Sequence, residues 1–97
     1  MNPKINRYGD KEWYDSDGAL HREDGPAIEF IGAAKFWFIH GKRHREDGPA
    51  IYYNGDYIYK EFWLDGNRYG EKEYWEKIKE LNKCKLFKLK DKKIGWI

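Results

Sequence analysis

Residues 21–28, His-Arg-Glu-Asp-Gly-Pro-Ala-Ile, recur without change at residues 44–51, 23 positions further along the chain. Residues upstream keep the same spacing, so that Trp13-Tyr14 aligns with Phe36-Trp37. A fixed period of this length indicates a repeat architecture, in which each unit buries its apolar face against its neighbour.

A third copy of the repeat begins and then decays. Residues 62–69 follow the pattern of residues 37–44, but Tyr69 stands where the second copy has His44. Gly70 then replaces the arginine, and the Asp-Gly-Pro turn is absent. The decay predicts that the stack of repeats ends here and that a different element covers it.

Glycine-containing turns divide each period into short strands. Asp-Gly and Asn-Gly pairs are strong signals for a β-hairpin turn, since glycine adopts positive φ at little cost. Proline cannot donate to a β-ladder and lies at strand starts or edges. The chain therefore predicts an antiparallel meander of about six to eight short strands. The turns are Asp17-Gly18, His40-Gly41, Asn54-Gly55 and Asp65-Gly66, together with Asp24-Gly25-Pro26 and Asp47-Gly48-Pro49.

We expect a single, mainly β (β+α) domain over residues 1–97, with the hairpin repeats at about 9–70. The helical spacing of Tyr74, Ile78 and Leu81 predicts one amphipathic C-terminal helix over about 71–82. A Lys-rich segment, 83–97, follows this helix and has the pattern of a final short hairpin.

Composition excludes several classes of protein. Aromatic residues make up 19% of the chain, so rings must fill much of the core. Cys84 is the only cysteine, which excludes a disulfide framework and a cysteine-based zinc site. No apolar run approaches the ~20 residues of a membrane span, and the first residues do not resemble a signal peptide. These features predict a cytoplasmic protein that does not bind membranes.

The formal net charge of +2 conceals a division of charge along the chain. Residues 82–97 carry six lysines and one aspartate, a net charge of +5, which leaves −3 for residues 1–81. A basic segment with rings suits nucleic acid or an acidic partner. Lysine also protects exposed sheet edges from aggregation, so a solvated edge strand is the alternative interpretation.

The repeated cluster contains residue types used in catalysis, because histidine can transfer protons and aspartate can orient it. A single active site rarely occurs twice, however. We therefore assign structural roles: aspartate caps the turn, arginine pairs with an acid and histidine packs on a ring of the next repeat. The residues with these roles are His21, Arg22, Asp24, Gly25, Pro26, His44, Arg45, Asp47, Gly48 and Pro49.

Other routes to catalysis lack the necessary residues. Zinc requires three or four ligands, and His40 is the only histidine besides His21 and His44. Ser16 is the only serine, and the glycines are spaced as turns rather than as a phosphate-binding loop. We expect no enzyme, no metal site and no cofactor.

Aromatic and basic side chains are better candidates for function. Tryptophan often dominates the binding energy of protein interfaces, and rings can also stack on bases while lysines bind phosphates. An uncovered sheet edge further allows a homodimer or an added strand from a partner. The candidate partner-binding residues are Trp13, Trp37, Trp63, Lys85, Lys88 and Lys90.

The octapeptide, preceded by an aromatic pair and an x-Gly turn, resembles the "HREDGPA" repeat of small bacteriophage and large-virus proteins. That family is similar in outline to variant MORN repeats. The resemblance covers about Gly9–Leu81, including the stretch in which a last hairpin runs into a helix. The Lys-rich segment lies outside the pattern, as does Ile31-Gly32-Ala33-Ala34, where an Asn-Gly-type turn is typical.

This resemblance implies a β-hairpin repeat module from a virus, acting in the cytoplasm of a host cell. It implies no enzymatic activity. We expect a binding protein that inhibits a host protein, such as a counter-defence inhibitor of the anti-CRISPR kind. One alternative is a module that binds nucleic acid or a nucleotide through the Lys-rich tail and the aromatic faces. Another is a purely structural or antitoxin-like repeat protein.

Overall fold

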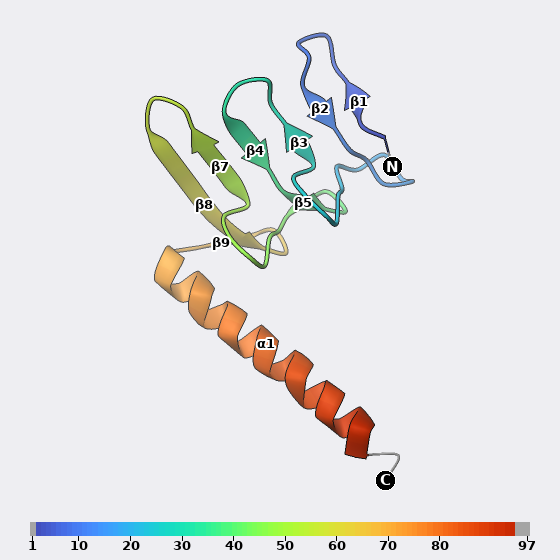
Figure 1. The fold of residues 1–97 in the computed structure, drawn as a ribbon, viewed down its shortest axis with the longest axis vertical. Coiled ribbons are helices and arrows are strands. Elements are labelled where there is room, and N and C mark those ends of the chain that lie inside the picture. The colour runs from blue at the N-terminus through green and yellow to red at the C-terminus, as the bar shows by residue number, and fades with distance from the viewer. Residues whose placement is uncertain (1, 95–97) are drawn as a thin grey trace.

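The computed structural model describes the backbone of residues 2–94 and the side chains of residues 2–85. Within this part, nine short strands precede one long helix (Figure 1). The elements are β1 (Lys4–Ile5), β2 (Lys11–Glu12), β3 (Ile28–Glu29), β4 (Ala34–Phe36), β5 (Phe38–Ile39), β6 (Lys42–Arg43), β7 (Ile51–Asn54), β8 (Ile58–Leu64), β9 (Asn67–Tyr69) and α1 (Glu71–Ile94).

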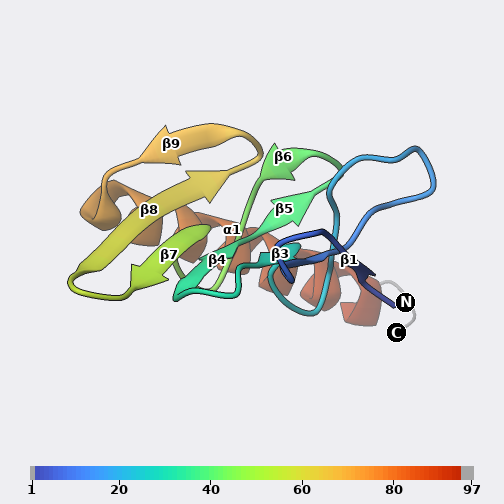
Figure 2. The same cartoon turned by 90° about the horizontal axis from the view of Figure 1, so that it is seen from above.

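Seven of these strands form one antiparallel sheet in the order β1-β2-β3-β4-β7-β8-β9, and β5 pairs with β6 alone. The hairpins β1–β2, β3–β4 and β7–β8 lie side by side, with their tips at the same end of the molecule (Figure 1). Seen from above, the β5–β6 hairpin lies beside this row (Figure 2). The expected mainly β fold, an antiparallel hairpin meander followed by one C-terminal helix, is confirmed.

The two repeats differ by one residue in the hairpin before the octapeptide. Trp13 donates its backbone N–H to Ala27 O (2.8 Å), and Trp37 donates its backbone N–H to Ala50 O (2.7 Å). Trp13 therefore corresponds to Trp37, and its expected alignment with Phe36 is wrong. The first hairpin turns through a longer loop than the two-residue loop of the second, which shifts the alignment by one position.

Backbone hydrogen bonds join each repeat to the next at equivalent positions. Arg22 donates its N–H to Phe38 O (3.1 Å), and Gly41 donates its N–H to Leu20 O (2.7 Å). Contacts between neighbouring units are typical of stacked repeats, in which stability accumulates from one unit to the next. The corresponding bonds between the second and third repeats run from Arg45 N–H to Trp63 O and from Gly66 N–H to Arg43 O.

The largest buried cluster lies where the helix meets the last strands. Phe62 and Leu64 of β8 pack against Tyr74 and Ile78 of α1, and each of these four residues is at most 8% exposed. Phe62 and Leu64 lie on one face of β8, because side chains alternate between the two faces of a strand. The helix thus covers the face of the sheet where the repeats end.

Helix α1 continues to Ile94, so the expected helix end near residue 82 and the expected final short hairpin after it are wrong. No glycine or proline interrupts residues 71–94, and lysine, leucine and glutamate favour helix in this segment. Glu71 and Glu73 lie in the first turn, where acids complement the helix dipole. Residues 95–97, the end of the Lys-rich segment, lie outside the described residues.

The apolar stripe of the helix is shorter than its sequence suggested. Tyr74 and Ile78 are buried, but Leu81 and Trp75 remain 37% and 39% exposed. The helix runs away from the sheet after its first turns (Figure 1), so its later apolar residues have little surface to pack on. Within the described residues, no helix is both long enough and apolar enough to cross a lipid bilayer.

Candidate functional site at the octapeptide loops

A stacked arginine organises the first loop, defined here as residues 21–28. The guanidinium of Arg22 lies 3.8 Å from the ring centroid of Trp13. Its Nε donates to Asp24 Oδ1 (3.0 Å), and its Nη1 donates to Pro26 O (3.2 Å) and Glu29 Oε2 (2.9 Å). The hydrogen bond from Arg22 holds the pKa of Asp24 below its usual range. Together, a cation over an indole face and charge-assisted hydrogen bonds fix the loop conformation.

The second loop, residues 44–51, repeats this arrangement closely. Arg45 lies 3.9 Å from the ring centroid of Trp37. Its Nε donates to Asp47 Oδ1 (2.8 Å), and its Nη1 donates to Pro49 O (3.0 Å). At the position of Glu29, the second repeat has Tyr52, so no carboxylate meets the guanidinium from that strand. The two loops therefore share a backbone framework but carry different charges beside it.

Glycine at the fifth octapeptide position makes room for the arginine. A Cβ atom on Gly25 would lie 2.9 Å from Arg22 Cζ, and one on Gly48 would lie 2.9 Å from Arg45 Cζ. Such distances are shorter than real carbon contacts, so any other residue would displace the guanidinium. Each loop is thus a stack of tryptophan, arginine and glycine, which explains why arginine and glycine recur three residues apart.

The histidines of the two loops contact the turn of the next repeat. His21 Nδ1 accepts a hydrogen bond from His40 N–H (2.9 Å), and His44 Nδ1 accepts one from Asp65 N–H (2.8 Å). His40 and Asp65 have φ values of 47° and 51°, and each precedes a glycine in a tight turn. Among the described side chains, packing of a loop histidine on a ring, as the sequence suggested, is seen for His21, whose ring centroid lies 4.0 Å from that of His40.

Asp15, His21 and His40 form a cluster of metal-ligand type, with one potential ligand atom of each within 4.8 Å of the others. His40 Nδ1 donates to Asp15 Oδ2 (2.7 Å), and this bond holds the pKa of Asp15 below its usual range. The two imidazole planes are stacked, 23° apart. Nitrogen lone pairs lie in the ring plane, so stacked rings do not direct them to one ion. The cluster is therefore organised as a hydrogen-bonded link between repeats.

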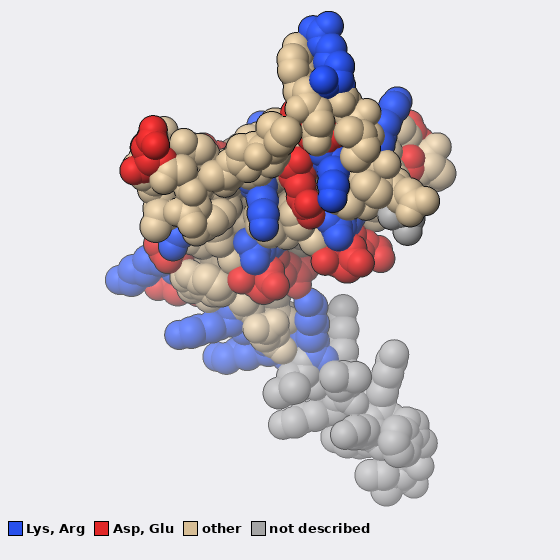
Figure 3. Space-filling model, turned by 45° about the horizontal axis from the view of Figure 1, so that its top comes forward, with Lys and Arg blue, Asp and Glu red and all other residues tan. Residues whose placement is uncertain are grey.

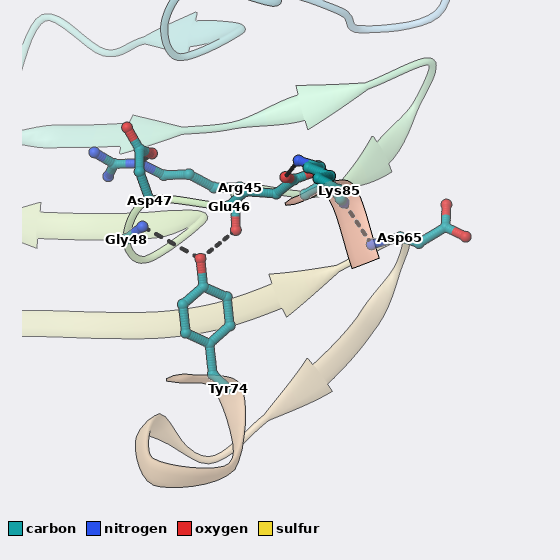
Figure 4. A network of polar contacts seen from close by, with 8 residues as sticks. Arg45, Glu46, Asp47, Gly48, Asp65, Tyr74 and Lys85 are labelled. Carbon is teal, nitrogen blue, oxygen red and sulfur yellow. Dashed lines mark hydrogen bonds and ion pairs between the residues drawn. The ribbon is translucent and has the colours of Figure 1, made fainter. Parts of the chain in front are cut away.

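Helix α1 contacts the second loop through a buried tyrosine. The Tyr74 hydroxyl donates to Arg45 O and accepts from Gly48 N–H (3.2 Å). Figure 4 shows the tyrosine reaching from the helix to the backbone of this loop. Tyr74 is 0% exposed, and burial raises the pKa of its phenol. This contact ties the end of the repeat stack to the cap.

A charged contact lies beside this tyrosine. Lys85 Nζ donates to Glu46 Oε1 (2.6 Å; both residues are labelled in Figure 4). His44 Nε2 donates to Glu46 Oε2 (3.0 Å). These hydrogen bonds, first from Lys85 and then from His44, hold the pKa of Glu46 below its usual range. The side chain of Glu46 remains 42% exposed, so solvent weakens both interactions.

An open groove of about 800 Å³ separates the two loops. Trp37 and Ile39 contribute apolar surface, while arginines, a histidine and acids of both loops form the rest of its lining. Glu23 and Asp47 have side chains that are 83% and 84% exposed. A groove with an indole and accessible charges of both signs can bind an extended, mixed-charge segment.

The structure distributes the sequence-derived binding residues over separate places. Trp13 is 8% exposed beneath Arg22, and Trp37 lines the groove. Trp63 donates its Nε1–H to Glu61 Oε1 (2.9 Å) and so lies on the other face of the sheet. Lys85 contacts the second loop, whereas the side chains of Lys88 and Lys90 lie outside the described part of the chain.

Sequence reasoning missed two residues that organise these loops. The helical spacing places Tyr74 only in the apolar stripe of the helix. Its hydroxyl contact with the second loop could not be predicted, because it depends on where the helix packs. Nothing in the local sequence marks Asp15, because its partner His40 lies 25 residues further along the chain. Aligning the turn at Asp17-Gly18 with the turn at His40-Gly41 is the signal that places Asp15 near that histidine.

The resemblance of the octapeptide to the "HREDGPA" repeat stays a prediction. The tryptophan–arginine–glycine stack and the histidine contact each require their residue types at fixed spacing, which gives a physical reason for the repeat itself. Comparisons of the chain with protein-family models, with curated proteins and with solved structures found no match.

Proposed function

We propose that this chain is a non-enzymatic binding protein that inhibits a protein of its host. The observation that supports this proposal most is that the residues of catalytic type already make structural contacts. The arginines stack on tryptophans, and His21 and His44 accept hydrogen bonds from turn N–H groups. A histidine whose Nδ1 accepts a hydrogen bond from a turn N–H is constrained in transferring protons. We therefore favour binding over catalysis as the function of these loops.

The groove between the loops is the proposed contact surface. Its apolar part, Trp37 and Ile39, suits an apolar side chain of the partner. The exposed carboxylates of Glu23, Asp24 and Asp47 stand at its rim and suit neighbouring basic side chains. The proposed target segment is therefore extended, with an apolar residue flanked by lysine or arginine.

The resemblance to bacteriophage repeats makes the proposal more specific. A small viral protein without catalytic residues suits counter-defence, in which it blocks a component of a host defence system in the cytoplasm. The anti-CRISPR kind of inhibitor is one such role. A structural or antitoxin-like role is the alternative outcome of the experiment below.

The test is affinity capture from host lysate with the wild-type chain and two charge variants. Glu23→Lys reverses a charge at the groove, and Asp17→Lys makes the same change at the exposed tip of the first hairpin. We expect a stoichiometric protein partner with wild type and Asp17→Lys, and at least a tenfold lower yield with Glu23→Lys. A partner held equally by all three chains, or no partner, would contradict the proposal.

A further inference from the structure

A row of side chains crosses the sheet on the face that helix α1 partly covers. The strand register places Lys11, Glu29, Lys35, Tyr52 and Lys60 directly opposite one another along β2, β3, β4, β7 and β8. Directly paired residues share a face. With strands about 4.8 Å apart, neighbouring lysines of the row lie about 10 Å apart and the whole row spans about 19 Å.

The lysines follow the period of the repeat. Each stands two residues before an aromatic residue at an equivalent place in the stack, on the same face of its strand. The repeat therefore places one lysine next to each ring along its strand. The pairs are Lys11 with Trp13, Lys35 with Trp37, and Lys60 with Phe62.

The positive charge of this row is available to a partner. Lys11, Lys35 and Lys60 are exposed, and none of them forms an ion pair with another described residue. Glu29 is the only acid of the row, and Arg22 Nη1 neutralises it at 2.9 Å. Within the described residues, the row thus presents three cations without an ion-pair partner.

Rings accompany the cations at one end of the row. An open groove of about 450 Å³ is lined there by Lys35, Lys60, Arg45, Trp37, Tyr52 and Ile58, together with two prolines. Tyr52 lies between the two lysines in the register and is half-buried. Cations that follow a backbone beside rings that stack on bases are the features of a surface for single-stranded nucleic acid.

We propose that this lysine row binds single-stranded nucleic acid, with phosphates on the lysines and a base on Tyr52. A row of this length suits a short site of about four nucleotides, at the lower end of the sizes known for single-stranded sites. This site goes beyond the groove between the loops, because it lies on the sheet and takes a different kind of partner. The two grooves share Trp37 and Arg45 in their linings.

The acids of the octapeptide loops favour a single strand of nucleic acid over a wider polyanion, such as a duplex or a lipid surface. Arg22 bridges Glu29 of the row to Asp24 of the first loop, so the loop acids begin one guanidinium away from the row. Figure 3 shows Lys and Arg side chains over the sheet and a band of Asp and Glu side chains below them. A duplex or a lipid surface would press on both regions and meet like charge.

The test is fluorescence anisotropy with labelled oligonucleotides of about eight nucleotides, dT and U, which match a small site. We expect binding by the wild-type chain at ~50 mM salt that weakens about 20-fold at ~200 mM, as three released counterions require. The variant Lys11→Gln/Lys35→Gln/Lys60→Gln should lose at least tenfold in affinity. Tyr52→Leu should lose about tenfold through its ring alone.

The matched control is Lys72→Gln/Lys79→Gln/Lys83→Gln, which removes the same charge from exposed positions of the helix. It should keep affinity within about twofold. Circular dichroism checks that both triple variants fold. Absence of binding at ~100 μM protein, equal loss in both variants, or tighter binding of a duplex or of anionic-lipid vesicles would overturn the proposal.

Discussion

The first and second octapeptide loops have identical sequences but different surroundings. Both hold an arginine between a tryptophan and a glycine, with ring distances of 3.8 and 3.9 Å. Glu23 of the first loop is 83% exposed, whereas the equivalent Glu46 is 42% exposed and bonded to Lys85. Tyr74 contacts only the second loop. The octapeptide thus determines its own conformation, while its place in the stack determines what it touches.

Replacing Tyr74 with alanine should be the most destabilising of these substitutions. The change removes a fully buried ring that packs on Phe62 and also removes the contact with the second loop. We expect the free energy of unfolding to fall by about 3–5 kcal/mol in urea titrations. Tyr74→Phe, which keeps the ring, should cost about 1–3 kcal/mol because Arg45 O and Gly48 N–H lose their partner.

Hydrogen exchange should show the same asymmetry. In Tyr74→Phe, the amide of Gly48 should exchange faster, and the equivalent amide of Gly25 should not change. Equal effects at both glycines would mean that the helix does not act on the second loop separately.

Substituting alanine for the loop glycines should affect both loops alike. Gly25→Ala and Gly48→Ala each place a Cβ atom 2.9 Å from an arginine Cζ, so the guanidinium must shift from its position over the tryptophan. We expect about 1–3 kcal/mol of destabilisation for each in thermal or urea unfolding. Gly32→Ala is the control, since nothing lies within 4 Å of its Cβ position, and it should be close to neutral. A neutral Gly48→Ala would rule out the stack as described.

Removing the histidine rings should weaken the joints between repeats. His21→Ala and His44→Ala each leave a turn N–H without its acceptor, at His40 and Asp65 respectively. We expect about 0.5–1.5 kcal/mol for each, measured by urea unfolding. Asparagine offers an acceptor oxygen, so His44→Asn should recover part of the loss, and no recovery would argue against a hydrogen-bonding role.

The smallest expected effect is on the pH dependence of stability, through Glu46 of the second loop. Because Lys85 and His44 lower the pKa of Glu46 in the folded protein, the pair stabilises the fold above the ordinary pKa of about 4.3. That contribution disappears as pH falls through the lowered value, and solvent keeps it below about 1 kcal/mol. Lys85→Gln should raise the Glu46 pKa in a carboxyl NMR titration, and an unchanged titration would exclude the contact in solution.

Much of the fold could be predicted from local signals. The pairs Asp17-Gly18, His40-Gly41 and Asp65-Gly66 lie at tight turns, with His40 and Asp65 themselves at positive φ. Alternation of side chains puts Phe62 and Leu64 on one face of β8, but rings occur on both faces, so only the structure shows that this face is the buried one. The length of the helix was predicted poorly, because a Lys-rich segment with scattered apolar residues has no sharp stop signal before Gly95.

The site could be predicted only in part, for a physical reason. The sequence showed that the octapeptide residues act together, but the guanidinium contacts depend on a tryptophan nine residues before Arg22 and eight before Arg45. A one-residue difference in the hairpin hid that equivalence. Likewise, the lysine row follows from strand register, which long-range pairing decides and single strands do not reveal.

The sequence by itself determined the repeat, its turns, the aromatic core and the division of charge, because these depend on neighbouring residues and on composition. The tertiary structure alone decided which copy of the octapeptide meets the helix and which lysines form a row. Both outcomes depend on contacts between residues far apart in the chain, such as Tyr74 with Gly48 and Lys35 with Tyr52. Packing and strand register, which no single segment encodes, bring those residues together.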